Sequence, residues 1–136
     1  MGLSHLRICL DTSAYSAFKR GHAGVGEALG RAERIVLTPV VIGELLVGFK
    51  GGAREKENRD ELRRFLSSPR VDIAPVVEET AERYAEILGH LRKAGTPIPT
   101  NDVWIAATAM QLGLAVLTTD AHYERVPQVI AELHFL

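Results

Sequence analysis

The sequence predicts a single α/β domain in which a mostly parallel central sheet of four to five strands is flanked by helices. Short apolar, β-branched runs alternate along the chain with segments of helical periodicity. The 136 residues are enough for a substantial core, and residues 1–136 contain no internal repeat, low-complexity tract or long linker. Strands separated by helices usually lie parallel in one layered sheet, which decides the fold class.

Five short apolar runs are expected to form the strands. They cover residues 6–10, 34–38, 71–76, 114–119 and, as a possible last strand, 132–136. Apolar residues in them are nearly continuous rather than alternating, as in strands that are buried on both faces of a sheet.

Helical segments fill the chain between these runs. They cover residues 14–31 (one or two helices broken by glycines), 39–50, 53–67, 78–94 and 101–112. Gly51 and Gly52 separate the second from the third segment. The fourth is the clearest, because its apolar residues recur every three or four positions. The last ends at Gly113, a residue well suited to stop a helix.

The composition is that of an ordinary folded protein without bulk affinity for nucleic acid. Apolar residues make up 46% of the chain, charged residues 24%, and the formal net charge is −1, so a nucleic-acid role needs a local basic surface. The single cysteine, Cys9, is expected to be a buried hydrophobe and fits a reducing compartment. No apolar stretch approaches the ~20 residues of a membrane span, and no signal-peptide pattern is present. We therefore expect a cytoplasmic protein without a membrane partner.

Four carboxylates are predicted to meet at the carboxyl edge of the sheet. Asp11 and Asp120 directly follow the first and fourth apolar runs. Glu44 lies in the early turns of the helix after the second run, and such a helix begins at the carboxyl edge. Asp102 lies at the start of the helix that leads into the fourth run, which must begin at the same edge. Open α/β sheets bind their ligands there.

Three of the four acids also have an ordinary structural interpretation. Asp11 could cap the helix after it, Asp120 could be a turn residue, and Asp102 could be stabilised by the dipole of its helix. Glu44 differs, because its helical neighbours are apolar residues or glycine, and no lysine or arginine lies three or four positions away. A glutamate on an apolar face favours a functional role.

Several carboxylates gathered in one place favour a bound divalent cation. Two carboxylates about 5 Å apart repel by roughly 3 kcal/mol at an effective dielectric constant of 20, and a cation removes that repulsion. An all-oxygen site without a neighbouring cysteine or histidine pattern suits Mg²⁺ or Mn²⁺ and disfavours zinc. Such an ion activates water and binds phosphate oxygens, so the predicted reaction is phosphodiester hydrolysis.

Four segments resemble the PIN domain of the VapC-type toxins, the ribonuclease halves of bacterial and archaeal toxin–antitoxin pairs. They are ICLDTSAY (8–15), PVVIGELLVG (39–48), TNDVWIAATA (100–109) and LTTDAHYERV (117–126). The resemblance covers essentially the whole chain and implies one PIN-like domain over residues 1–136.

Residue by residue, Asp11, Glu44, Asp102 and Asp120 match the acidic quartet of that family. The resemblance implies endonucleolytic cleavage of RNA that depends on Mg²⁺ or Mn²⁺. Asp11 and Asp102 would be metal ligands, and Glu44 and Asp120 would complete the shell directly or through water.

Thr12, Ser13 and Thr119 match small hydroxyl residues that the family keeps beside its acids. This implies that they position ligands or phosphate, although turn and cap hydrogen bonds explain them at least as well. The resemblance also implies a homodimer and a cognate antitoxin that covers or enters the acidic cleft.

Basic residues that could guide RNA lie mainly in segment 50–64, which has six lysines and arginines against four acids. Lys19 and Arg20 are further candidates. An ordinary solvated helix face explains the segment slightly better than a phosphate-binding surface. We expect a surface or loop role for His122, because the predicted chemistry needs no imidazole.

Two alternatives remain open. A non-catalytic PIN-like module that binds RNA or protein would be expected to have lost at least one acid, whereas all four are present. Another aspartate-based phosphoryl-transfer enzyme is disfavoured. A haloacid-dehalogenase-type phosphatase would have aspartate in place of Ser13, and a phospho-receiver needs an acid directly after a middle strand.

Overall fold

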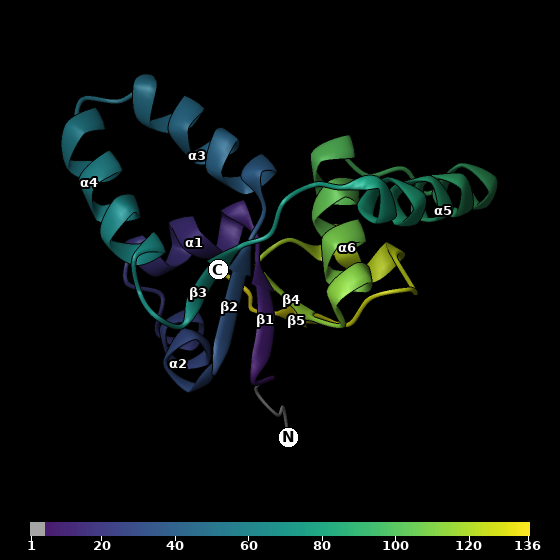
Figure 1. The fold of residues 1–136 in the computed structure, drawn as a ribbon, viewed down its shortest axis with the longest axis horizontal. Coiled ribbons are helices and arrows are strands. Elements are labelled where there is room, and N and C mark those ends of the chain that lie inside the picture. Colours follow the sequence, from purple (N-terminus) through teal and green to yellow (C-terminus); the bar gives the residue numbers. More distant parts are fainter. Residues whose placement is uncertain (1–4) are drawn as a thin grey trace.

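The computed structural model describes residues 5–136, which form a parallel sheet between helices (Figure 1). The strands are β1 (Arg7–Leu10), β2 (Arg34–Leu37), β3 (Val71–Ile73), β4 (Ala115–Thr118) and β5 (Ala131–Leu133). Their order is β3-β2-β1-β4-β5, and every neighbouring pair is parallel. The predicted α/β fold is confirmed. The third strand is shorter than expected because Pro75 has no N–H for a sheet ladder.

The helices occupy the expected positions along the chain. They are α1 (Thr12–Lys19), α2 (Ala23–Arg31), α3 (Pro39–Lys50), α4 (Glu55–Leu66), α5 (Glu78–Ala94), α6 (Thr100–Leu112) and the short 3₁₀ helix η1 (Ala121–Arg125). Segment 14–31 forms two helices because the chain turns at Gly21, whose φ of 87° is rarely adopted by other residues. Helices α1 and α2 lie on one side of the sheet and α5 and α6 on the other, while α3 and α4 extend from the edge where the strands end (Figure 1).

The two central strands supply the middle of the core. Ile8, Cys9 and Leu10 of β1 and Val116 and Leu117 of β4 have no exposed surface, as expected of parallel strands covered on both faces. Burial raises the pKa of the Cys9 thiol to about 12, and the nearby Asp11 charge adds to this, so the thiol stays protonated as a core side chain.

Buried polar side chains gather where the strands end. Asp11, Thr38 and Thr118 are each at most 3% exposed and directly follow or complete β1, β2 and β4. The interior is therefore apolar along the strands and polar at their carboxyl ends, where the candidate acids lie. Among residues 5–136, no helix has the length and apolar character needed to cross a membrane.

Candidate active site

Asp11 is the N-cap of α1 and is enclosed by hydrogen-bond donors. Its Oδ1 accepts from the backbone N–H of Ala14 at 2.8 Å, and its Oδ2 accepts from the Thr118 hydroxyl at 2.6 Å. The Ser13 hydroxyl lies 2.9 and 3.0 Å from the two oxygens. Burial nevertheless raises the pKa of Asp11 to about 6, and the neighbouring charge of Asp102 acts in the same direction. One carboxylate thus caps a helix and remains a desolvated charge in a fixed orientation.

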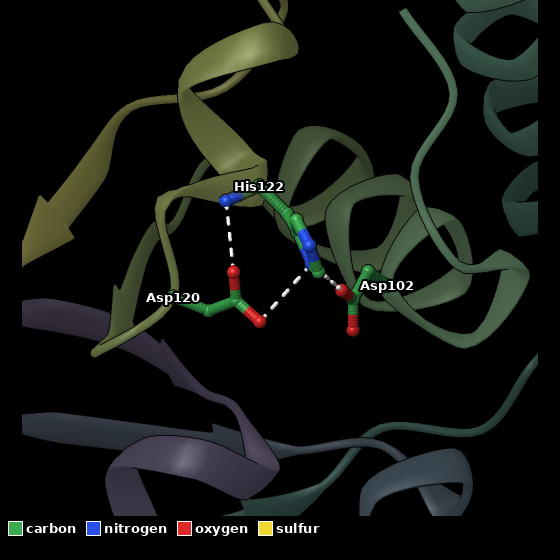
Figure 2. A group of neighbouring side chains, drawn as sticks. All are labelled: Asp102, Asp120 and His122. Carbon is green, nitrogen blue, oxygen red and sulfur yellow. Dashed lines mark hydrogen bonds and ion pairs between the residues drawn. The ribbon is translucent and has the colours of Figure 1, made fainter.

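Asp102, Asp120 and His122 form the tightest cluster of possible metal ligands in residues 5–136, with one ligand atom from each within 4.8 Å of the others. The His122 ring stands between the two carboxylates (Figure 2). Its Nδ1 lies 3.0 Å from Oδ2 of Asp102 and 3.0 Å from Oδ2 of Asp120. Burial raises the pKa of Asp102, whereas the hydrogen bond with His122 lowers it. The cluster joins the start of α6 to the segment after β4.

The expectation that no histidine neighbours the acids is wrong, because the partly exposed His122 ring contacts both Asp102 and Asp120. Asp120 caps η1 by accepting the backbone N–H of His122 through Oδ1 at 2.9 Å, which is an Asx turn. This turn holds the imidazole beside the carboxylate that precedes it by two residues. Aspartate followed at the second position by histidine is a sequence signal that could have indicated the arrangement.

Glu44 is held at the same edge from α3. Its Oε1 accepts from the Thr12 hydroxyl at 2.6 Å, and its Oε2 accepts from the Asn101 side-chain amide at 3.0 Å. Thr12 directly follows Asp11, and Asn101 directly precedes Asp102, so Glu44 is linked to both other elements of the site. Asn101 was not among the predicted site residues.

The surface of α3 around Glu44 is apolar and open to solvent. Val47, one turn further along the helix, is 72% exposed. A groove beside the acid is lined by Pro39, Val40, Gly43, Glu44, Val47 and Asn101. The apolar surroundings read from the sequence are therefore present, with Val41 in the core and Val47 on the accessible surface.

The hydroxyl residues near Asp11 differ in what they contribute. Ser13 contacts both Asp11 oxygens, whereas Thr119 donates its backbone N–H to the Ser13 hydroxyl at 3.1 Å. The hydroxyl that reaches Asp11 from the end of β4 is that of Thr118, which also accepts the Asp120 N–H at 2.9 Å. Thr118 was not predicted, and a role of the hydroxyl residues in binding phosphate stays a prediction.

Tyr123 places a buried phenol close to these acids. It is 1% exposed, and its hydroxyl makes no close hydrogen bond within residues 5–136 but interacts with the Asp102 carboxylate. Burial raises the pKa of Tyr123, as do the charges of Asp11 and Asp102, so the phenol keeps its proton. The site therefore contains a protonated hydroxyl beside the Asp102 carboxylate.

The basic residues of segment 50–64 are largely paired with acids on the same segment. Four ion pairs join Lys50 to Glu55, Arg54 to Glu57, Lys56 to Asp60 and Arg59 to Glu55. Lys19, the other cation considered for RNA, lies 2.9 Å from Glu61. These contacts favour a solvated helix face, and contact of this segment with RNA stays a prediction.

A family model for the PIN domain matches residues 8–129. The chain belongs to the PIN-domain family. This PIN domain is 33% identical over 111 residues to Ribonuclease VapC5 of Mycobacterium tuberculosis, a match that covers 82% of the chain and 81% of the relative.

Solved structures agree with this family. The PIN domain aligns with VapBC-5 of Mycobacterium tuberculosis, a member of the VapBC family of toxin–antitoxin systems, with a TM-score of 0.72 and 28% identity. That alignment covers 97% of this chain and all of the other. The PIN domain also aligns with VapBC2 of Rickettsia felis, solved with a promoter DNA fragment, with a TM-score of 0.83. At 23% identity over 93% of this chain and 98% of that one, this match shows the fold.

The donors of this PIN domain fit a divalent cation. Carboxylate oxygens of Asp102 and Asp120 lie together with an imidazole nitrogen, and Asp11 is close enough for Asp102 to raise its pKa. Asp102 interacts electrostatically with both Asp11 and Asp120, so the three acids bring uncompensated negative charge to one place. A hydrated cation compensates this charge.

Proposed function

We propose that this PIN domain is a metal-dependent endoribonuclease and the toxin component of a toxin–antitoxin pair. The observation that carries the proposal is the placement of Asp11, Asp102 and Asp120 at one sheet edge, with Glu44 hydrogen-bonded to residues adjacent to two of them. Relatives named Ribonuclease VapC support RNA as the substrate. A non-catalytic binding module would have no reason to keep this costly set of carboxylates.

Asp11, Asp102 and Asp120 would hold Mg²⁺ or Mn²⁺, and Glu44 would complete the site directly or through water. A divalent ion bound there polarises a phosphate oxygen and lowers the pKa of water. The protein contributes rigidity, because Asp11 accepts hydrogen bonds from β4 and α1, and Glu44 accepts them from α1 and α6. Carboxylates fixed in this way lose little freedom when the substrate binds.

Small hydroxyl groups at the same edge are proposed to orient the RNA phosphate. Thr12 and Ser13 lie in the first turn of α1, where backbone N–H groups and the helix dipole favour an anion. Thr119 directly follows β4 at this edge and donates its N–H to Ser13. The three residues therefore lie beside the predicted metal ligands, two on α1 and one after β4.

We further propose a cognate antitoxin and a homodimer as protein partners. The VapBC toxin–antitoxin structures that share the fold support the antitoxin. For the homodimer, the supporting feature is a ring stack that joins α5 to α6. The partly exposed rings of Tyr84 and Trp104 lie 4.0 Å apart between centroids, and aromatic residues are enriched in such interfaces.

The direct test is RNA cleavage by the purified chain, free of any antitoxin, with Mg²⁺ or Mn²⁺ and with EDTA. Cleavage should require the ion and should be abolished by Asp102→Asn, because asparagine keeps the helix start but not the charge. Asp72→Asn is the matched control, since Asp72 is an exposed β3 residue paired with Arg34. Failure to cleave any RNA with either metal would favour the non-catalytic binding module.

A further inference from the structure

His122 is the one histidine of residues 5–136 that belongs to the cluster of possible metal ligands. The backbone and the side chain of His122 are both held in place by hydrogen bonds. The backbone is held by the Asx turn to Asp120, and Nδ1 is directed at the Oδ2 atoms of Asp102 and Asp120 (Figure 2). The imidazole is therefore part of the acidic site and not a neighbour that happens to be exposed.

The distances within the cluster suit direct coordination. Adjacent ligands of an octahedral ion with bonds of about 2.1 Å lie about 3.0 Å apart. Nδ1 of His122 lies 3.0 Å from each of the two Oδ2 atoms. The two N···O separations of the metal-free site thus match those expected between adjacent ligands of one ion.

A second observation at the site also points to a ligand. The Tyr123 hydroxyl is buried next to the same acids and makes no close hydrogen bond within residues 5–136, although its interaction with the Asp102 carboxylate raises its pKa. A hydrated ion or an ion with a bound phosphate brings further oxygen atoms that can accept from this hydroxyl.

We propose that His122 is a nitrogen ligand of the divalent ion and gives this site a preference for first-row transition-metal ions over Mg²⁺. This inference rests on the proposed function, which places a metal among the acids. Mg²⁺ prefers oxygen ligands in octahedral geometry, whereas imidazole nitrogen strengthens the binding of transition-metal ions. Nδ1 coordinates in the tautomer that has its proton on Nε2.

Mn²⁺ is the probe for the test, because it is paramagnetic and reports its own ligands. Binding to the full chain is measured by electron paramagnetic resonance, and Mg²⁺ is added as competitor. Pulsed measurements then detect ¹⁴N coupling to the bound ion. The variants are His122→Asn, which removes the imidazole, and His90→Asn, which changes an exposed α5 histidine outside the site. Circular dichroism checks that both fold.

We expect the wild type and His90→Asn to show ¹⁴N coupling and to bind Mn²⁺ at least about tenfold more tightly than Mg²⁺. In His122→Asn the coupling should disappear and Mn²⁺ affinity should fall by at least about tenfold, with Mg²⁺ affinity changed by less than about threefold. If His122→Asn does not fold, the ¹⁴N signal of the wild type still decides the assignment.

Mn²⁺ bound without ¹⁴N coupling, or bound no more tightly than Mg²⁺, would overturn the inference and leave His122 as a hydrogen-bonding partner of the carboxylates. The proposed function fails differently. Mn²⁺ bound through nitrogen by a chain that cleaves no RNA would overturn the nuclease but not the ligand. No binding of either ion would overturn both.

Discussion

Replacement of Asp11 by asparagine should stabilise the metal-free protein at neutral pH. Burial raises the pKa of Asp11 from 3.8 to about 6, so the folded state binds the proton more tightly than the unfolded chain. A shift of about two units corresponds to about 3 kcal/mol. The contribution of Asp11 to the stability of the metal-free wild type is therefore most favourable below about pH 4 and falls by this amount as the pH rises through about 6.

Asparagine can preserve the local structure that Asp11 makes. It remains a good N-cap for α1, and its oxygen can accept the Ala14 N–H. Its amide can donate to the Thr118 hydroxyl, which already accepts the Asp120 N–H and can turn its proton to Ser13, 3.3 Å away. The substitution thus removes the buried charge and keeps the hydrogen-bond pattern.

The assay is urea unfolding in EDTA at one protein concentration, followed by circular dichroism at about pH 4 to 8. At pH values above about 7, Asp11→Asn should gain up to about 3 kcal/mol, or roughly 10 °C in Tm, and the gain should vanish near pH 4. The exposed-site variant Asp72→Asn should follow the wild type. If Asp11→Asn shows the same pH dependence as the wild type, the reasoning that the buried Asp11 charge costs stability is refuted.

Three further substitutions separate stability from catalysis. Thr118→Val leaves an Asp11 oxygen and the Asp120 N–H without their shared partner, so the free energy of unfolding should fall by about 1–3 kcal/mol. Thr118→Ser should restore it in denaturant titrations, and equal losses would exclude the hydroxyl as the cause. Glu44→Gln keeps the size of the side chain and one of its two acceptor oxygens but removes the charge. RNA cleavage should therefore fall at least about tenfold with little change in Tm; undiminished cleavage would remove Glu44 from the site. Gly113→Ala should cost about 1 kcal/mol, because Gly113 ends α6 with a φ of 68°. Thermal melts equal to those of the wild type would contradict this.

The position of the four acids at one sheet edge could be predicted from the sequence, because a general rule of sheet geometry places them there. Parallel strands share a carboxyl edge, so acids that follow β1 and β4, or that begin α3 and α6, lie at that one edge. Asp11 and Asp120 follow from strand ends, and Glu44 and Asp102 from helix starts. The strand order, which places β2 and β4 directly beside β1, then brings these acids close together.

Features that depend on a single turn or a single hydroxyl were missed for a physical reason. His122 joins the acids through a 3₁₀ helix of five residues, which is too short to have a hydrophobic period. Thr118 and Thr119 are adjacent and chemically identical, but strand alternation directs neighbouring side chains to opposite sides. Only the three-dimensional structure shows that the hydroxyl of Thr118 donates to Asp11. The ion pairs within segment 50–64 follow from its helical spacing and agree with the solvated helix face that the sequence favoured.

The strand order also sets when activity can arise in a growing chain. β1 is made first and can pair with β2 early, but its other neighbour, β4, begins more than 100 residues later, at Ala115. The Asp102, Asp120 and His122 cluster and the Thr118 hydroxyl on Asp11 all await α6, β4 and η1. Domains generally fold as units during synthesis, so a nascent chain or a fragment that stops before β4 has Asp11 and Glu44 without their partners. On the proposed function, the acidic site is complete only after η1 has been made, close to the end of the described chain.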